Sequence, residues 1–215
     1  MMDPHFNNNF VPVVADELEQ LILQEIARRV RVSAAPQVLD LPAGDGRHAA
    51  AMARLGAQVL AADQAGREAS VRGRALAEGL ADQVDFLACE LGGGRLPEGP
   101  FDLVFCHHGI HRLPYPEARQ VVRALLRSLR IGGKLFISAY GLHSALGEGY
   151  ADYEQEVEQR FAHLAPAQAR CYNIDGPVCL YTERNLVTLL FEAGGSVLRS
   201  FTSTHGTVKS VAVRV

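Results

Sequence analysis

The sequence predicts an α/β fold of the doubly wound class, with a mostly parallel sheet of seven strands that ends in an antiparallel hairpin. Two observations predict this fold. Short apolar runs alternate along the chain with amphipathic stretches of helical period, and a turn with two glycines directly follows the first apolar run. Such alternation is typical of a parallel sheet with helices on both faces, because parallel crossovers need a connecting helix.

The first half of the chain supplies four of the strands. Residues 15–31 have the apolar spacing of an amphipathic helix. A strand at 38–41 runs into a turn at 42–46, and the Ala-rich helix after it ends near residue 55, where Gly56 can adopt a left-handed conformation. Strands follow at 58–62, 84–88 and 101–106, with a polar helix at 67–78. The run 101–106 is apolar apart from Asp102, which suits a central strand.

The second half supplies one more parallel strand and the hairpin. Apolar side chains at helical spacing predict a helix over 116–130, which Gly132 and Gly133 end before a strand at 134–139. Residues 141–181 are the least regular part and contain a helical stretch near 152–163. Thr182 can cap a helix that runs to residue 193, and strands at 197–202 and 209–215 complete the sheet.

Length and composition indicate one globular domain over residues 1–215. With 48% hydrophobic and 21% charged residues, the chain has the composition of a folded protein with one sizeable core. The formal net charge of −3 makes nucleic acid an unfavoured partner. No run approaches the roughly 20 apolar residues of a membrane helix, and the polar start lacks a signal-peptide core. Four cysteines without a CxxC pair suggest reduced thiols, so we expect a cytoplasmic protein without membrane contact.

The main chemical signal is the segment from Asp40 to His48, which follows the first strand and opens a helix. In doubly wound sheets, ligands bind at the carboxyl ends of the strands, where the strand order reverses. Gly44 and Gly46 let the backbone approach a ligand closely. Asp63 ends the next strand, where a carboxylate can accept hydrogen bonds from both hydroxyls of a ribose. These residues alone also satisfy the loose pattern of a dinucleotide site.

The acids of the turn favour a cationic ligand over a dinucleotide. A dinucleotide places its pyrophosphate at the helix N-terminus after this turn, where Asp40 and Asp45 lie in or beside it. Two like charges about 4 Å apart repel each other by roughly 4 kcal/mol at an effective dielectric constant of 20. S-adenosylmethionine carries a sulfonium and an ammonium group and no phosphate, and therefore suits an acidic turn.

With these residues the chain resembles the class I S-adenosylmethionine-dependent methyltransferases. Residues 38–46 resemble the first motif of that family, and residues 59–63 resemble its second strand with the ribose-binding acid. Further matches follow in the family's order at residues 100–104, 126–135, 181–186 and 192–194. Among its subgroups, the chain is similar to the small methyltransferases of the tellurite-resistance and thiopurine types, which act on small molecules.

The resemblance implies a Rossmann-like fold, S-adenosylmethionine as the cofactor, and methyl transfer to a small-molecule acceptor by in-line displacement. The implied cofactor-binding residues are Asp40, Pro42, Gly44, Gly46, Asp63, Gln64, Glu90, Leu91 and His107. Asp40 holds the methionine ammonium group through water, Asp63 holds the ribose, and His107 offers its backbone carbonyl to the ammonium group. Gln64 and Leu91 flank the adenine.

Two positions depart from the family's pattern. Pro42 stands where the family more often has glycine, and proline fixes φ near −65° and removes an N–H donor. After the third strand the family often has an aspartate that contacts the adenine amino group, whereas this chain has Cys89 and Glu90. We assign that role to Glu90, whose longer side chain requires a different geometry.

The acceptor site is expected at the carboxyl ends of the fourth and fifth strands. His108, His111 and Tyr140 are the candidate catalytic residues, with a histidine as general base toward the acceptor. Residues 141–181 form an insert over the acceptor, and residues 1–33 form a helix and lid. The histidines predict no metal site, because no acid or cysteine completes one by spacing.

Other functions remain open from the sequence. A nicotinamide-dependent oxidoreductase on a similar sheet is opposed by the acids at 40 and 45. A binding module that has lost transfer activity agrees with the same cofactor residues. A methyltransferase acting on RNA or protein is less favoured by the overall charge. Monomer and homodimer are both compatible with the sequence.

Overall fold

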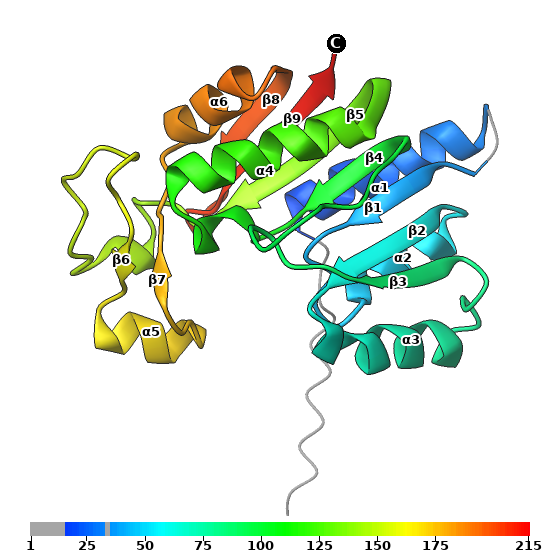
Figure 1. Ribbon diagram of the computed structural model, residues 1–215, viewed down its shortest axis with the longest axis horizontal. Coiled ribbons are helices and arrows are strands. Elements are labelled where there is room, and N and C mark those ends of the chain that lie inside the picture. Colours follow the sequence, from blue (N-terminus) through cyan, green and yellow to red (C-terminus); the bar gives the residue numbers. More distant parts are fainter. Residues whose placement is uncertain (1–15, 33–34) are drawn as a thin grey trace, which may run out of the picture.

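The structure is a computed structural model that describes residues 16–32 and 35–215. Its seven-stranded sheet has the order β3-β2-β1-β4-β5-β9-β8 (Figure 1). The strands are β1 (Gln37–Asp40), β2 (Gln58–Asp63), β3 (Val84–Ala88), β4 (Phe101–Cys106), β5 (Leu129–Ala139), β8 (Gly195–Thr202) and β9 (Val208–Arg214). The first five are parallel, and β9 runs antiparallel to both β5 and β8. The predicted doubly wound sheet with its C-terminal hairpin is therefore confirmed.

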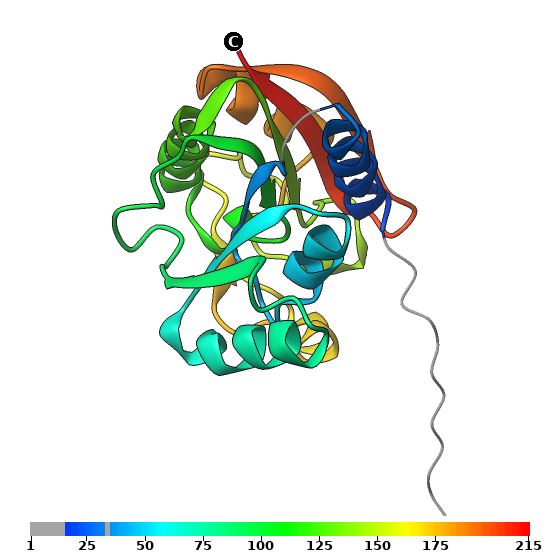
Figure 2. The same ribbon diagram turned by 90° about the vertical axis from the view of Figure 1, so that its right-hand side faces the viewer.

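Two layers of helices cover the sheet (Figure 2). One face carries α1 (Glu17–Val30), α2 (Arg47–Arg54) and α3 (Glu68–Ala77), and the other carries α4 (Tyr115–Ser128) and α6 (Glu183–Glu192). In β4, Leu103 and Phe105 pack in the core between the sheet and α1, α2 and α3. Val104 and Cys106 pack in the core on the other face, between the sheet and α4 and α6. This alternation explains why the strand is apolar apart from Asp102, since side chains on both of its faces are buried.

The chain order reverses at β1. This strand pairs with β2 on one side and with β4 on the other, so the connections that leave β1 and β3 run in opposite directions across the sheet. The loops at the carboxyl ends of β1 and β4 separate at this point and leave space for a ligand. The topology therefore places the turn after β1 at a binding position.

The ends of two helices follow the capping rules. Asp16 precedes α1, and its carboxylate accepts a hydrogen bond from the backbone N–H of Glu19 at 2.9 Å. Thr182 precedes α6 and forms a reciprocal capping box with Asn185, which confirms its predicted role. Gly56 follows α2 with φ of +93°, a left-handed conformation that ends the helix.

The fifth strand begins earlier than the sequence predicts. The expected helix to residue 130 ends at Ser128, and Leu129 is already extended and paired with Phe101. Pairing resumes only at Lys134, opposite Leu103, so β5 bulges between these points. The prediction was wrong because Gly132 and Gly133 lie within an irregular strand and do not separate the helix from it.

The helix expected near 152–163 was also wrong. The segment forms turns, followed by the short elements β6 (Ala162–His163), α5 (Pro166–Tyr172) and β7 (Pro177–Val178). Its hydrogen bonds pair side chains with backbone groups outside the helical pattern. Arg160 donates to the carbonyls of Gln155 at 2.6 Å and Leu180 at 2.8 Å, and the Asp152 carboxylate accepts from the N–H of Phe161 at 2.9 Å.

Residues 141–181 build a small apolar cluster of their own. Figure 1 places β6, α5 and β7 beyond the carboxyl ends of β4 and β5. Three 3₁₀ turns, η1 (Ala65–Arg67), η2 (Ile110–Arg112) and η3 (Ala145–Gly147), complete the described elements. None of the described helices has the length and apolar character needed to cross a membrane.

Candidate functional site

A cavity of about 400 Å³ lies at the carboxyl ends of β1, β2, β3 and β4. Its volume is within the range of small-molecule sites. Eight of the residues predicted from the sequence line it: Pro42, Gly44, Asp63, Gln64, Glu90, Leu91, His107 and His108. Four other predicted residues, Asp40, Gly46, His111 and Tyr140, are not part of its wall. The sheet therefore brings most of the predicted residues together, although they come from four separate segments.

Asp63 organises the turn after β1. Its Oδ2 accepts a hydrogen bond from the backbone N–H of Gly44 at 2.7 Å, and its Oδ1 accepts one from the N–H of Gln64 at 2.7 Å. A carboxylate has about four acceptor positions, so each oxygen retains a lone pair. Because Asp63 also lines the cavity, these lone pairs are available to hydroxyl groups of a ligand.

The structure gives Gly46 a packing role. It precedes α2 with φ of +80°, and a Cβ atom there would lie 3.0 Å from the Cα of Val71 in α3. Gly44 also has positive φ, +60°, but a Cβ atom there would have no neighbour within 4 Å. Only Gly44 of the pair lines the cavity. The two glycines of the turn thus have different roles.

Substitution by alanine should separate these roles. We expect Gly46→Ala to lower the free energy of unfolding by about 3 kcal/mol, since it adds a steric clash to left-handed backbone strain. Gly44→Ala carries the backbone strain alone and should lower it by about 1 kcal/mol. Urea unfolding of both variants measures the difference, and equal losses would contradict the packing role of Gly46.

Asp40 is completely buried beneath the turn. Neither carboxylate oxygen has a hydrogen-bond partner among the described residues, although the N–H of Ala49 in the first turn of α2 faces the group. Burial raises the pKa of Asp40 to about 7, and the nearby carboxylates of Asp63 and Glu19 add to the effect, while His48 opposes it. A buried acid without partners suits a position close to a bound cation.

Asp45 contributes less to the electrostatics than the sequence suggests. It is exposed, and its carboxylate forms an ion pair with Arg74 of α3 at 2.6 Å. The other oxygen accepts from the N–H of Arg47 at 3.1 Å. The negative character of the site therefore comes from Asp40, Asp63 and Glu90.

A row of histidines stands at the end of β4. The rings of His107 and His108 stack at 4.1 Å with an interplanar angle of 5°, and His48 lies 5.1 Å from His107. His107 Nε2 lies 2.7 Å from the Asp16 carboxylate, which also contacts Lys209 Nζ at 3.4 Å. Partial burial raises the pKa of Asp16, but the hydrogen bond to His107 outweighs this effect and holds the pKa well below its ordinary value.

This contact ties the start of α1 to β4 and β9, and sequence reasoning missed it. Asp16 and His107 are 91 positions apart, and no local pattern links them. The only available signal is that Asp16 is an N-cap residue at the start of a helix. Of the helix and lid predicted over 1–33, residues 16–32 contain α1, and residues 1–15 and 33 lie outside the described residues.

His108 is a neutral imidazole held in an unusual backbone conformation. Its φ is +52°, and its backbone N–H donates to Ser138 Oγ at 3.0 Å. Burial, together with the neighbouring His107, lowers the pKa of His108 to about 3. A left-handed conformation in a residue other than glycine is uncommon and indicates a position fixed by its surroundings.

His111 and Tyr140 lie behind His108. Tyr140 packs edge-on against His108 at 4.5 Å, and His111 packs against Tyr140 at 4.3 Å. His111 is 1% exposed, and burial lowers its pKa well below the ordinary value. We therefore reassign His111 as a packing partner of Tyr140. Among residues 16–32 and 35–215, no group of three or more metal-ligating side chains could hold a metal ion.

Comparisons with known proteins point to one family. Residues 38–133 match the family described as "Methyltransferase domain". The chain is 31% identical over 146 residues to the tRNA 5-carboxymethoxyuridine methyltransferase of Escherichia coli K12, a match that covers 66% of this chain and 55% of that protein. It is 35% identical over 131 residues to the ubiquinone biosynthesis O-methyltransferase of Xanthomonas oryzae pv. oryzae PXO99A, covering 56% and 49%. The chain thus spans about half the length of the curated relatives that it matches.

The fold resembles that of solved methyltransferase structures. A SAM-dependent methyltransferase from Methanosarcina mazei superposes with a TM-score of 0.68 at 16% identity, covering 90% of this chain and 97% of the other. At this identity the likeness concerns the fold. It supports the assignment of the sheet order.

Proposed function

We propose that this chain is a class I S-adenosylmethionine-dependent methyltransferase that transfers the methyl group of S-adenosylmethionine to a small-molecule acceptor. One observation carries the proposal. At the switch point of the sheet, the cavity has Asp63 in its wall and the buried, unpartnered carboxyl group of Asp40 beneath its floor. This combination offers acceptors to a ribose and negative potential to a cation.

The residues present fit this cofactor. Asp63 would accept the ribose hydroxyls, Glu90 the adenine amino group, and Gln64 and Leu91 would flank the ring, since all four line the cavity. Asp40 would act on the ammonium group by its negative potential, because its side chain has no exposed surface for a direct contact. The charge distribution opposes a dinucleotide, whose pyrophosphate would meet these acids at the start of α2.

The cofactor supplies a methyl group that is already activated, so the chain's own residues have to align the acceptor and exclude water. His108 and Tyr140 stand where an acceptor would approach from the ends of β4 and β5. With a pKa of about 3, His108 is neutral at pH 7 and only a weak base. We infer that it orients the acceptor by a hydrogen bond.

The size of the cavity supports a small acceptor. About 400 Å³ leaves little room beside a cofactor for more than a small molecule. The two relatives act on different acceptors, since one is named for a tRNA nucleoside and the other for ubiquinone biosynthesis. A cytoplasmic location is part of the proposal, and the four free cysteines support a reducing compartment.

The test is release of S-adenosylhomocysteine by the full chain from S-adenosylmethionine with a panel of phenols, carboxylic acids, amines and thiols. The proposal expects acceptor-dependent release that Asp63→Ala abolishes. Cofactor binding without release for any of these acceptors would favour a binding module. Release only with RNA would replace the small-molecule acceptor.

A variant of His108 distinguishes orientation from base catalysis. Asparagine tolerates left-handed backbone well, so His108→Asn preserves the local chain path. We expect kcat to fall by about tenfold or less, and the rate to show no ionisation of His108 between pH 6 and 9. General base catalysis contributes about 10²–10⁴-fold, so a loss of that size would contradict the inference.

A further inference from the structure

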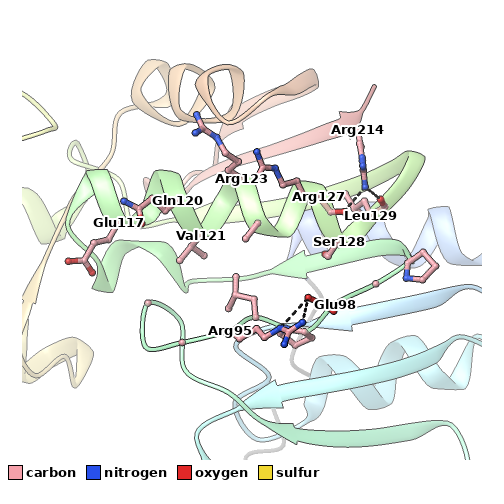
Figure 3. Close-up of a pocket in the computed structure, with 17 residues that line it drawn as sticks. Arg95, Glu98, Glu117, Gln120, Val121, Arg123, Arg127, Ser128, Leu129 and Arg214 are labelled. Atoms are coloured by element: carbon pink, nitrogen blue, oxygen red, sulfur yellow. Dashed lines mark hydrogen bonds and ion pairs between the residues drawn. The ribbon is translucent and has the colours of Figure 1, made fainter.

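A second and larger hollow lies away from the cofactor cavity, along α4 (Figure 3). It has a volume of about 1150 Å³ and runs between α4 and residues 92–100 of the connection from β3 to β4. That connection contains three consecutive glycines, together with Pro97 and Pro100, and forms no helix. The glycines and prolines of this connection disfavour a helix, and the groove lies where a crossover helix would otherwise pack beside α4.

Four arginines line the groove, together with two glutamates, Glu98 and Glu117. Arg123 and Arg127 come from α4, Arg214 from the end of β9, and Arg95 from the loop (Figure 3). Arg95 forms an ion pair with Glu98 at 2.6 Å.

The other three guanidinium groups have no carboxylate partner in the part of the chain that the structure describes. Arg123 donates to the backbone carbonyl of Glu192 at 2.9 Å, and Arg214 donates to the carbonyls of Arg127 and Leu129. The guanidinium group of Arg127 has neither a hydrogen bond nor an ion pair to another described residue. The second carboxylate of the lining, Glu117, forms no ion pair with these groups and lies at the opposite end of α4 from Arg127 (Figure 3). The groove therefore has a local excess of positive charge around Arg123, Arg127 and Arg214.

Helix capping does not account for this charge. The end of a helix carries about half a negative charge, which is far less than three guanidinium groups. Arg123 and Arg127 are four residues apart on α4 and therefore neighbours, and like charges at this spacing destabilise a helix. The whole chain has a net charge of −3, so this local excess of positive charge is not a general property of its surface.

We propose that this groove binds a phosphate-bearing small molecule, with its phosphate groups held by Arg123, Arg127 and Arg214. Guanidinium groups match phosphate oxygens in geometry and form charge-assisted hydrogen bonds with them. Leu96 and Val121 provide an apolar wall for the organic part of the ligand. The lining contains no aromatic side chain, so it lacks the stacking platforms that single-stranded nucleic acid uses.

The groove is distinct from the cofactor cavity. The two share no lining residue, although they adjoin where Gly92 packs against Leu113, whose side chain lies 2.6 Å from the position of a Cβ atom on Gly92. A ligand in the groove therefore leaves the cofactor cavity open. Binding there should not compete with S-adenosylhomocysteine, and the site stands whether or not the chain transfers methyl groups.

The test is calorimetric titration of the full chain with inorganic tripolyphosphate at low and high salt. We expect saturable binding that weakens with salt and is unchanged by saturating S-adenosylhomocysteine. Arg127→Gln should weaken it roughly tenfold, and Arg123→Gln together with Arg127→Gln by a further factor of ten. The matched control replaces Arg72 and Arg170, which are exposed on α3 and α5 outside the groove, by glutamine and should leave binding unchanged.

Three outcomes would overturn the proposal. One is the absence of saturable binding, and another is an equal loss in the control pair. The third is binding of oligouridylate, but not of tripolyphosphate, that depends on Arg127, because it would assign the groove to nucleic acid. Thermal unfolding of each variant shows whether it is folded, and Arg127→Gln removes no side-chain hydrogen bond or ion pair with another described residue.

Discussion

Replacing Asp63 by alanine is expected to weaken binding of S-adenosylhomocysteine by about a hundredfold or more. The variant removes the carboxylate that would accept both ribose hydroxyls. It also frees the backbone N–H groups of Gly44 and Gln64, each of which donates to this carboxylate at 2.7 Å. Calorimetric titration of the variant and the unaltered chain measures the change.

Asp45→Ala is the matched control for this prediction. Asp45 also lines the cavity, but it is exposed and paired with Arg74, so its loss should change the affinity by less than about threefold. If both variants lose affinity equally, the effect is one of net charge, and the assignment of Asp63 to the ribose is wrong.

Replacing Asp40 by asparagine is expected to stabilise the chain without ligand and to weaken cofactor binding. The pKa of about 7 lies above the ordinary value of 3.8, so the folded state binds the proton more tightly than the unfolded state does. The contribution of Asp40 to stability is therefore lost as the pH rises from about 4 to 7, and the ionised group opposes folding above that range. The amide of the Asp40→Asn variant carries no such charge.

Unfolding at two pH values tests this expectation. At pH 8 the Asp40→Asn variant should gain stability, with an upper limit on the order of 4 kcal/mol, whereas near pH 4 it should gain none. Its affinity for S-adenosylhomocysteine should fall at least tenfold at pH 8. A gain that does not depend on pH would contradict the buried charge as its cause, and unchanged affinity would separate Asp40 from the ligand.

Local sequence patterns were sufficient where one element determines its own structure. The apolar run 101–106 predicted a central strand, and Thr182 predicted the start of α6. The doubly wound, mostly parallel sheet followed from the alternation of elements, because parallel strands joined by helices have few arrangements. The patterns failed at Leu129, where pairing with Phe101 overrides the helical period. They also failed at 152–163, where the Arg160 side chain binds carbonyls five and 20 residues away.

In the candidate site, too, local patterns found some residues and missed those that depend on tertiary contacts. The turn after β1 and Asp63 were found because their position at the ends of strands is itself a sequence feature. The contact of Asp16 with His107 was not, because it depends on how α1 packs on the sheet. Burial also decides between roles that sequence leaves equal, since His108 lines the cavity and His111 is enclosed behind Tyr140.

The most direct test of the cofactor assignment is calorimetric titration of the full chain with S-adenosylhomocysteine and, separately, with NADH. We expect S-adenosylhomocysteine to bind with a dissociation constant in the micromolar range, about −8 kcal/mol, and NADH not to bind. Binding of NADH alone would contradict the account, because it would mean that the acids at the start of α2 accept a pyrophosphate.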